Sequence, residues 1–390
     1  MSEGSPLQDG IYFRPADRPP GRCFRLVLFN IRAGAALGDV GPGLAQMWAL
    51  LRDLRTGKIA DLDPTPPDEA EKARKAKLTC LLGFGARFFR RYRDVHPPRG
   101  VVPLGELTLP ALPWVADAQR QNGEADVVVQ LIADTDLAVD RALVELWMLL
   151  ARAGGFPLEL VTYYSGFNRD DRRSWLGFHD GISNIEPELR RKVIEVEVKD
   201  PPWMLGGTYM GFMRLAIDLA AWRERPRKEQ EILVGRDKLT GCPVTGVDAN
   251  GDPLRLAHCP MGANGPTSAN YIEPLAPPVA EALVRQSHIH RTNPNRRGVE
   301  EQSNRIFRQG YEFVEPLPNG QIRIGLNFVS FQSELERLTH ILTLFSWLGD
   351  SNFGGVANGA ARALSFISLV GGGFYAVPPK HDAFPGADMF

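Results

Sequence analysis

The order of predicted strands and helices constrains the fold of this chain more than any other feature. In the first half, four runs of apolar and β-branched residues predict strands at 25–31, 78–83, 126–132 and 158–164. Large apolar residues at helical spacing predict one helix over 41–54 and a second over 135–153. The predicted order is therefore strand, helix, strand, strand, helix, strand.

The second half repeats this order. Strands are predicted at 208–217, 305–314, 321–331 and 373–377, with a hairpin turn at 318–320. A charged helical segment opens at Asp218, and a helix capped by Ser333 is expected to run to about residue 348. Because both halves have the ferredoxin-like order, we expect an α+β fold of two tandem ferredoxin-like domains, each an antiparallel sheet covered by helices. A charged, Pro-rich stretch places the domain boundary near residue 200, giving domains 1–200 and 201–390.

Charge and motif content exclude several classes of function. Lys and Arg total 45 against 46 Asp and Glu, which argues against a nucleic-acid partner. The sequence contains no GxxxxGK[ST] phosphate loop, GxSxG elbow or HExxH helix. No apolar run reaches the roughly 18 residues of a membrane span, and no secretory signal is visible.

The cysteines lead to a prediction about redox state and compartment. The four residues, Cys23, Cys80, Cys242 and Cys259, form neither a CxxC nor a CxxCH motif. A disulfide framework, a cysteine zinc site and thioether-attached haem are therefore not expected. We expect unpaired cysteines and a cytoplasmic protein.

The stretch from Trp175 to Asn184 is the first candidate for chemistry. Asp180 lies between glycines in Gly177-Phe-His-Asp180-Gly181, so flanking turns can direct its carboxylate into a cavity, and Gly181 allows a flat cofactor to approach the backbone. The plainer reading is that Asp-Gly is only a turn dipeptide. His179 is expected in a turn or at the surface and not as a ligand.

The second candidate is Ser287-His288-Ile-His290-Arg291-Thr-Asn293-Pro294. Histidines at i and i+2 do not share a helix face, which disfavours a helical two-histidine metal site. Either one could be the single axial ligand that haem iron requires. The plainer reading is two polar histidines in a loop.

The third candidate is the predicted hairpin. Strand alternation places Arg308 on one face with Ile306 and Gly310, where a buried guanidinium needs an anionic or polar partner. On the returning strand, Leu326 and Phe328 share a face with Ser330 and predict an apolar wall. Arg305, on the other face of the first strand, is expected to extend to solvent.

Together these segments resemble the dye-decolourising (DyP-type) peroxidase family. Its GxxDG, HxRxxNPR, RIxRRG and GLLFxxFQ motifs are similar to the segments that begin at Gly177, His288, Arg305 and Gly325, in that order. The segments 206–210 and 235–243 also fit, so the resemblance extends over roughly residues 20 to 390.

The resemblance implies a haem peroxidase. It implies haem b (iron protoporphyrin IX) held between the two domains, with His288 as the proximal iron ligand. Asp180 and Arg308 are then the catalytic pair on the distal side, and Leu326 and Phe328 are walls of that pocket. The implied substrates are hydrogen peroxide and a small-molecule organic reductant.

Several positions depart from the family motifs. His290 stands where the family has an arginine near the haem propionates, so Arg291 becomes the candidate for that role. Asn295 and Gln309 each stand where the family has an arginine, and Asn327 stands where it has an apolar residue. These differences bear on haem affinity and substrate access.

Some alternatives stay open at this stage. The acid that orients the proximal histidine is either Glu334 or Asp350. A haem-handling protein with little turnover, or a haem-free structural or interaction protein, remains an alternative to the peroxidase. The natural reductant and the formation of a homo-oligomer also stay open.

Overall fold

The computed structural model describes residues 5–11, 19–98, 101, 124–152, 155–185, 187–197, 201–256, 259, 282–292, 305–343 and 366–390, and the structural statements below concern these residues.

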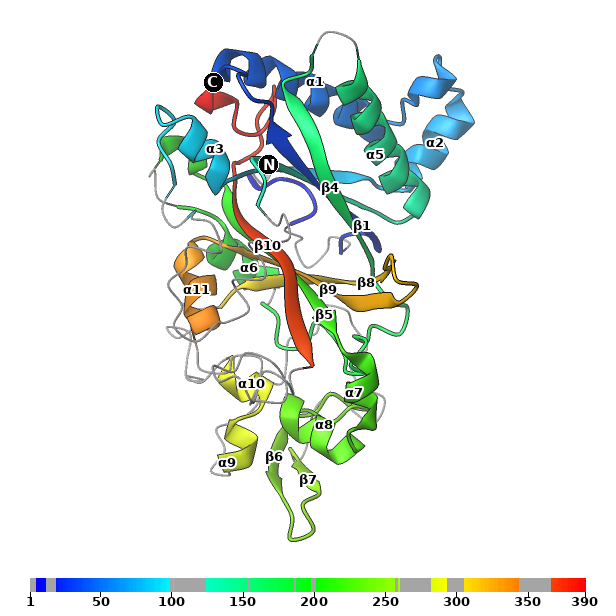
Figure 1. Cartoon of the computed structure of the whole chain (residues 1–390), viewed down its shortest axis with the longest axis vertical. Helices are drawn as coiled ribbons and strands as arrows, with labels where there is room; N and C mark the ends of the chain where they lie inside the picture. Colours follow the sequence, from blue (N-terminus) through cyan, green and yellow to red (C-terminus); the bar gives the residue numbers. More distant parts are fainter. Residues whose placement is uncertain are drawn as a thin grey trace.

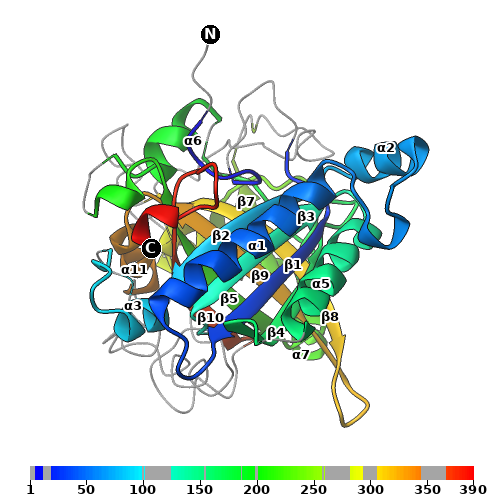
Figure 2. The ribbon, with the colours of Figure 1, turned by 90° about the horizontal axis from the view of Figure 1, so that it is seen from above.

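The first half of the chain forms a ferredoxin-like unit, as expected. Its elements follow the predicted order: β1 (Cys23–Ile31), α1 (Leu37–Arg55), β2 (Thr79–Gly85), β3 (Val127–Ala133), α5 (Asp136–Ala151) and β4 (Leu158–Phe167). Two shorter helices, α2 (Pro67–Lys75) and α3 (Ala86–Arg91), flank β2. The strands pair antiparallel in the order β4-β1-β3-β2. Helices α1 and α5 cover the outer face of this sheet (Figure 2).

The second half repeats the arrangement, which confirms the predicted duplication. Its sheet has the order β10-β5-β9-β8, formed by β5 (Thr208–Ile217), β8 (Phe307–Pro316), β9 (Ile322–Gln332) and β10 (Ile367–Val377). The helices of this half are α7 (Leu219–Glu224), α8 (Arg227–Val234), α9 (Ala282–Arg285), α10 (His288–Arg291) and α11 (Leu335–Thr343). A small hairpin of β6 (Val244–Val247) and β7 (Pro253–Arg255) projects beyond α8 (Figure 1). Strand β10 begins earlier than predicted because its glycines, which weaken a strand signal, continue the ladder.

The two sheets join at both edges into one closed sheet. Strand β4 meets β8 at the pair Phe167–Glu312, and β2 meets β10 at Gly85–Tyr375 and Phe84–Ala376. Aromatic and aliphatic side chains from both halves fill the interior, among them Phe24, Phe212 and Phe331. Closure therefore gives the two units a shared core in addition to the core under the helices.

The segment between the two units contains α6 (Pro187–Ile194) and leads to β5. We propose the domain boundary near residue 200, in this segment.

The expectation of unpaired cysteines is wrong for one pair. Cys242 and Cys259 form a disulfide, with Cα atoms 6.1 Å apart. The loops after α8 and β7 bring these residues together, which their separation of 17 positions does not reveal. Cys23 and Cys80 are buried and free. Within the described ranges, no helix is both long and apolar enough to cross a membrane.

Candidate functional site

Strand β8 carries the candidate arginine on the outer face of the closed sheet. Phe307 and Tyr311 point into the shared interior core. Arg308, Gly310 and Glu312 alternate with them and pair with Ser330, Phe328 and Leu326 of β9. The alternation predicted from the sequence is therefore correct, and Arg308 is half-buried.

The loop over this strand fixes Asp180 by turn geometry. Gly177 has φ +91° and Gly181 has φ +83°, conformations that favour glycine. The backbone N–H of Asp180 donates to the Arg172 carbonyl at 3.0 Å, and its Oδ1 accepts the Gly181 N–H at 2.7 Å. The Asp180 side chain is exposed, and its carboxylate reaches β8 at Gly310.

Gly310 makes room for that carboxylate. A Cβ at this position would lie 3.0 Å from Oδ2 of Asp180 and 3.1 Å from Cδ1 of Leu326. Any other residue here would require Asp180 or Leu326 to move.

Asn184, which follows the same loop, binds the main chain of Arg308 at two points. Its Oδ1 accepts the Arg308 N–H at 3.1 Å, and its Nδ2 donates to the Arg308 carbonyl at 2.8 Å. The guanidinium Nη2 of Arg308 donates to the Ile182 carbonyl at 2.9 Å. Burial lowers the pKa of Arg308, and the nearby Asp180 carboxylate partly offsets this.

Arg305 binds the same turn. Its Nη2 donates to the carbonyls of Ser183 and Asn184, each at 2.9 Å. The expectation that Arg305 extends to solvent is therefore wrong, because these two carbonyls need donors.

Five of the six predicted site residues line one pocket, here called the His288 pocket. They are Asp180, His288, Arg308, Leu326 and Phe328. Other apolar walls come from Leu176, Phe178, Leu215, Ile217 and Val234. Its lining therefore joins the 174–182 loop of the first domain to the sheet and helices of the second. The sixth predicted residue, Arg291, is not among its lining residues.

The two histidines of α10 have different environments. His288 is half-buried and lines the pocket together with Ile289. His290 is 7% exposed, and its Nδ1 lies 2.8 Å from the Ser287 hydroxyl. Because residues two apart in a helix face different sides, only His288 faces the pocket.

The other predicted residues are distributed as follows. His179 lines the pocket, but its Nε2 lies 3.1 Å from the Leu239 carbonyl and 2.9 Å from Nη2 of Arg173. Burial lowers the pKa of His179. Glu334 is not among the lining residues. Asp350 and Asn295 lie outside the described residues.

The two remaining departures from the family motifs lie on inward-facing positions. Asn327 is fully buried and accepts a hydrogen bond from Nη1 of Arg214 at 2.6 Å. Gln309 donates to the Gly10 carbonyl at 2.8 Å. Neither side chain lines the His288 pocket, but Gln309 lines the arginine pocket described below.

Sequence reasoning missed an arginine in this pocket. Arg236 is 5% exposed and donates to the Gly241 carbonyl at 2.8 Å and to the Ser183 hydroxyl at 2.7 Å. Arg236 belongs to the 235–243 segment, which resembles the family, and this resemblance could have identified it as a site residue. Its contacts connect the loop after α8 to the loop that carries Asp180.

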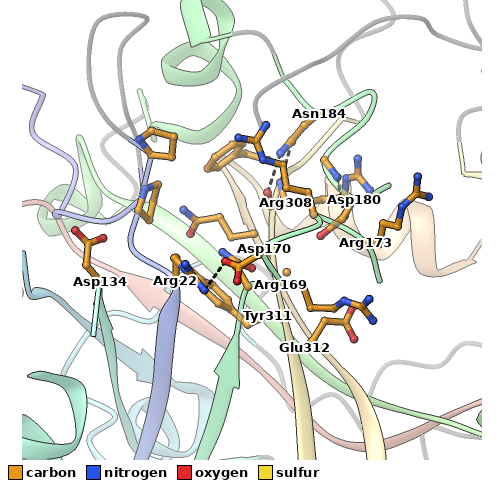
Figure 3. A pocket seen from close by; sticks show the side chains of 18 residues that line it. Arg22, Asp134, Arg169, Asp170, Arg173, Asp180, Asn184, Arg308, Tyr311 and Glu312 are labelled. Carbon is orange, nitrogen blue, oxygen red and sulfur yellow. Dashed lines mark hydrogen bonds and ion pairs between the residues drawn. The ribbon is translucent and has the colours of Figure 1, made fainter. Parts of the chain in front are cut away.

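A second cavity, of about 440 Å³, opens beside Asp180 (Figure 3) and is here called the arginine pocket. Four of its lining residues are shared with the His288 pocket: Asp180, Gly181, Arg308 and Gly310. Arginines and acids surround the rest, including Arg22 and Asp170, whose charged groups are 2.6 Å apart. Asp180 and Arg308 thus stand where a largely apolar pocket meets a polar one.

Glu312 also lines the arginine pocket and was not singled out in the sequence. Its side chain is buried, at 4% exposure. Burial and the neighbouring Asp180 carboxylate raise its pKa to about 8.

The donor set of the His288 pocket suits a planar prosthetic group with one axial ligand. His288 offers one imidazole, and the surrounding walls are largely apolar. This is the combination that a haem with a single protein ligand requires. In the described ranges, no group of three or more His, Cys, Asp or Glu side chains could hold a metal ion.

Comparison with known proteins gives a family match in the second half. Residues 171–382 match the family model described as "Dyp-type peroxidase, C-terminal". Deferrochelatases of Shigella sonnei (strain Ss046) and Escherichia coli (strain K12) are each 29% identical over 272 residues, or 66% of this chain. The alignment covers 56% of those relatives, so the chain spans little more than half their length.

Solved structures share the fold over nearly the whole chain. Ferric DtpA from Streptomyces lividans has a TM-score of 0.70 at 23% identity, covering 98% of this chain and 96% of that one. A DyP-type peroxidase from Streptomyces coelicolor has a TM-score of 0.70 at 22% identity, covering 97% and 95%. One from Cellulomonas bogoriensis has a TM-score of 0.68 at 21% identity, covering 98% and 95%.

Proposed function

The chain belongs to the Dyp-type peroxidase family, and on that premise we propose that it is a haem-dependent peroxidase. It would reduce hydrogen peroxide and oxidise dyes, phenols or other organic reductants. The observation that carries the proposal is that Asp180, Arg308 and His288 line one pocket although they come from a loop, a strand and a helix. A haem-free structural protein would not need these three together.

We propose haem b as the cofactor, with His288 as its iron ligand. Leu326 and Phe328 would pack against the ring, and Arg291 and Arg236 are candidates for pairing with its carboxylates. When bound, haem supplies the two electrons that reduce peroxide to water and recovers them one at a time from the reductant.

Asp180 would move the proton. Splitting the O–O bond heterolytically requires a group that takes a proton from one oxygen of peroxide and delivers it to the other. The Asp180 carboxylate has a hydrogen-bonded Oδ1 and a second oxygen, Oδ2, over Gly310. Oδ2 is therefore the atom we assign to proton transfer.

Arg308 would stabilise the hydroxide that develops on the leaving oxygen. Its charge is held in place by the Ile182 carbonyl and by the Asn184 side chain at its backbone. A preorganised charge needs no rearrangement during the reaction, which is why such groups lower the barrier effectively.

A second candidate function is haem handling with little peroxide turnover. The curated relatives named deferrochelatase favour it. It would use the same pocket and the same His288 but would not require proton transfer by Asp180.

One experiment separates the candidates. The purified chain is loaded with haem, and its Soret band and the oxidation of a phenolic reductant are followed after addition of peroxide. Sustained turnover that depends on Asp180 and Arg308 supports the peroxidase. A stable Soret band without turnover favours haem handling, and a chain that binds no haem refutes both.

The proposed compartment is the cytoplasm. The disulfide between Cys242 and Cys259 removes one of the two grounds for that expectation. Fractionation of the native cells tests it, and an exported form of the protein would contradict it.

A further inference from the structure

Three outward-facing positions of β8 form a row around Asp180. Arg308, Gly310 and Glu312 follow one another at every second residue, which separates neighbours by roughly 6.6 Å along a strand. The Asp180 carboxylate stands over the middle position, since its Oδ2 lies 3.0 Å from the place of a Gly310 Cβ. Asp180 thus has a basic side chain from one neighbouring position and an acidic one from the other (Figure 3).

Glu312 is poorly placed to carry a charge. Its carboxyl accepts a hydrogen bond from the Trp175 backbone N–H. Its Oε2 is buried and, among the described residues, has no hydrogen-bond partner. A buried carboxylate without full pairing is costly, so the protonated form is favoured.

The charged groups around Glu312 also favour its protonated form on balance. Asp180 and Asp171 raise its pKa, and Arg169 lowers it. Arg169 is already paired with Asp171, at 2.5 Å between Nη2 and Oδ2. Burial and Asp180 therefore dominate, and the pKa of Glu312 rises to about 8.

We propose that Glu312 and Asp180 form a carboxyl pair in which Glu312 keeps a proton, so that no second negative charge stands beside Arg308, and in which Asp180 is the member that accepts the proton of peroxide. The proposal rests on the function proposed for Asp180. Two carboxyls that share a site do not ionise together easily, so a proton held by one favours the charged form of the other. Glu312 acts through Asp180 and Arg308 and is a positioning residue.

The pair sets an alkaline limit to the reaction. When Glu312 loses its proton, a second negative charge appears beside Asp180. This charge offsets the positive charge of Arg308, which then stabilises the developing hydroxide less well. The reaction with peroxide therefore slows.

The first experiment measures the coupling without any turnover. Infrared spectra of the full chain as purified are recorded across the pH range and follow the C=O band of protonated carboxyls. We expect a band that disappears as the pH rises through about 8 and that Glu312→Gln lacks. In Asp180→Asn the loss should occur at lower pH, because a like charge has been removed. A titration that Asp180→Asn does not shift would overturn the pair.

The second experiment measures the alkaline limit in the haem-loaded protein. The rate of the peroxide-induced Soret change should fall about tenfold through the titration of Glu312, which corresponds to a coupling of about one pKa unit. Glu312→Gln should lack this fall, and Glu312→Asp, which keeps a carboxyl, should restore it in part.

Asp170→Asn is the matched control, because it removes one negative charge from the same pocket at an exposed position. In Asp170→Asn the rate of the peroxide reaction should decrease at alkaline pH as it does in the parent. The same decrease in Glu312→Gln would overturn the proposal. If that variant does not fold, the Asp180→Asn titration still decides, since it leaves Glu312 in place. A chain that shows the coupled titration but never reacts with peroxide would refute the proposed function and support the pair.

Discussion

The side chain of Asn184 pairs with the main chain of Arg308 much as a neighbouring strand would. It accepts the Arg308 N–H and donates to the Arg308 carbonyl, at 3.1 and 2.8 Å. Strand β4 pairs with β8 only near Glu312, so it does not supply these bonds at Arg308. One amide side chain therefore fixes the loop that carries Asp180 to the strand that carries Arg308.

Asn184→Ala should lower the rate of the peroxide reaction without preventing haem binding. It leaves the Arg308 N–H and carbonyl without these partners, at a cost of about 1–3 kcal/mol in the free energy of unfolding. Denaturant unfolding and stopped-flow absorbance would measure the two effects. Stability and rate both equal to the parent would contradict this role of Asn184.

His288→Ala should abolish stable haem loading. His290→Ala should leave loading mostly intact, because His290 is buried against Ser287 and does not line the pocket. The Soret absorbance per protein after reconstitution measures both. Loss of haem in His290→Ala alone would place the ligand at His290.

Asp180→Asn and Arg308→Leu should both keep haem and react more slowly with peroxide. Loss of a positioned charge such as Arg308 costs typically ~10²–10³-fold in rate, and this loss should hold at every pH. Loss of the proton-transferring Asp180 costs typically ~10²–10⁴-fold. Stopped-flow measurements of the peroxide reaction at several pH values would test both losses. Two variants as fast as the parent would refute the assignment.

Gly310→Ala should slow the peroxide reaction by displacing Asp180 or Leu326. The added Cβ would stand 3.0 and 3.1 Å from atoms of these side chains, and overpacking of this kind costs about 1–3 kcal/mol. Gly246→Ala is a suitable control, because among the described residues its Cβ would approach a single atom within 4 Å, Cδ1 of Leu254 at 3.7 Å. Steady-state kinetics and thermal unfolding of both variants give the comparison. Equal rates for Gly310→Ala and the parent would show that Asp180 does not depend on this space.

Glu312 should make the folded chain less stable as the pH rises from about 4.5 to about 8. Its pKa is raised in the folded state, so the folded chain binds more protons than the unfolded chain in this window, and stability falls with increasing pH. Glu312→Gln should reduce that slope. Chemical denaturation at several pH values measures it, with Asp170→Asn as the reference. An unchanged slope would mean that Glu312 is ionised in the folded protein.

Several features of the fold follow from local sequence patterns. Alternation along 305–331 predicted that Arg308 shares a face with Gly310 and that Leu326 shares a face with Phe328, because successive side chains of a strand point to opposite sides. The duplicated fold was also predicted, from the order of strands and helices in each half. This order can be read from the sequence because hydrophobic periodicity depends only on neighbouring residues. Gly177 and Gly181 also predicted the turn that carries Asp180, and both have the positive φ that such a turn needs.

Long-range pairing was decided only by the tertiary structure. The closing contacts of β4 with β8 and of β2 with β10 join residues far apart in the chain. The same holds for the pocket that brings His288 together with Asp180 and Arg308. The burial of Glu312 beside Asp180 likewise depends on a loop and a strand more than a hundred positions apart. A sequence pattern records the spacing of neighbours, whereas burial and charge coupling depend on which distant segments pack together, and these effects set the proton affinity of a carboxyl.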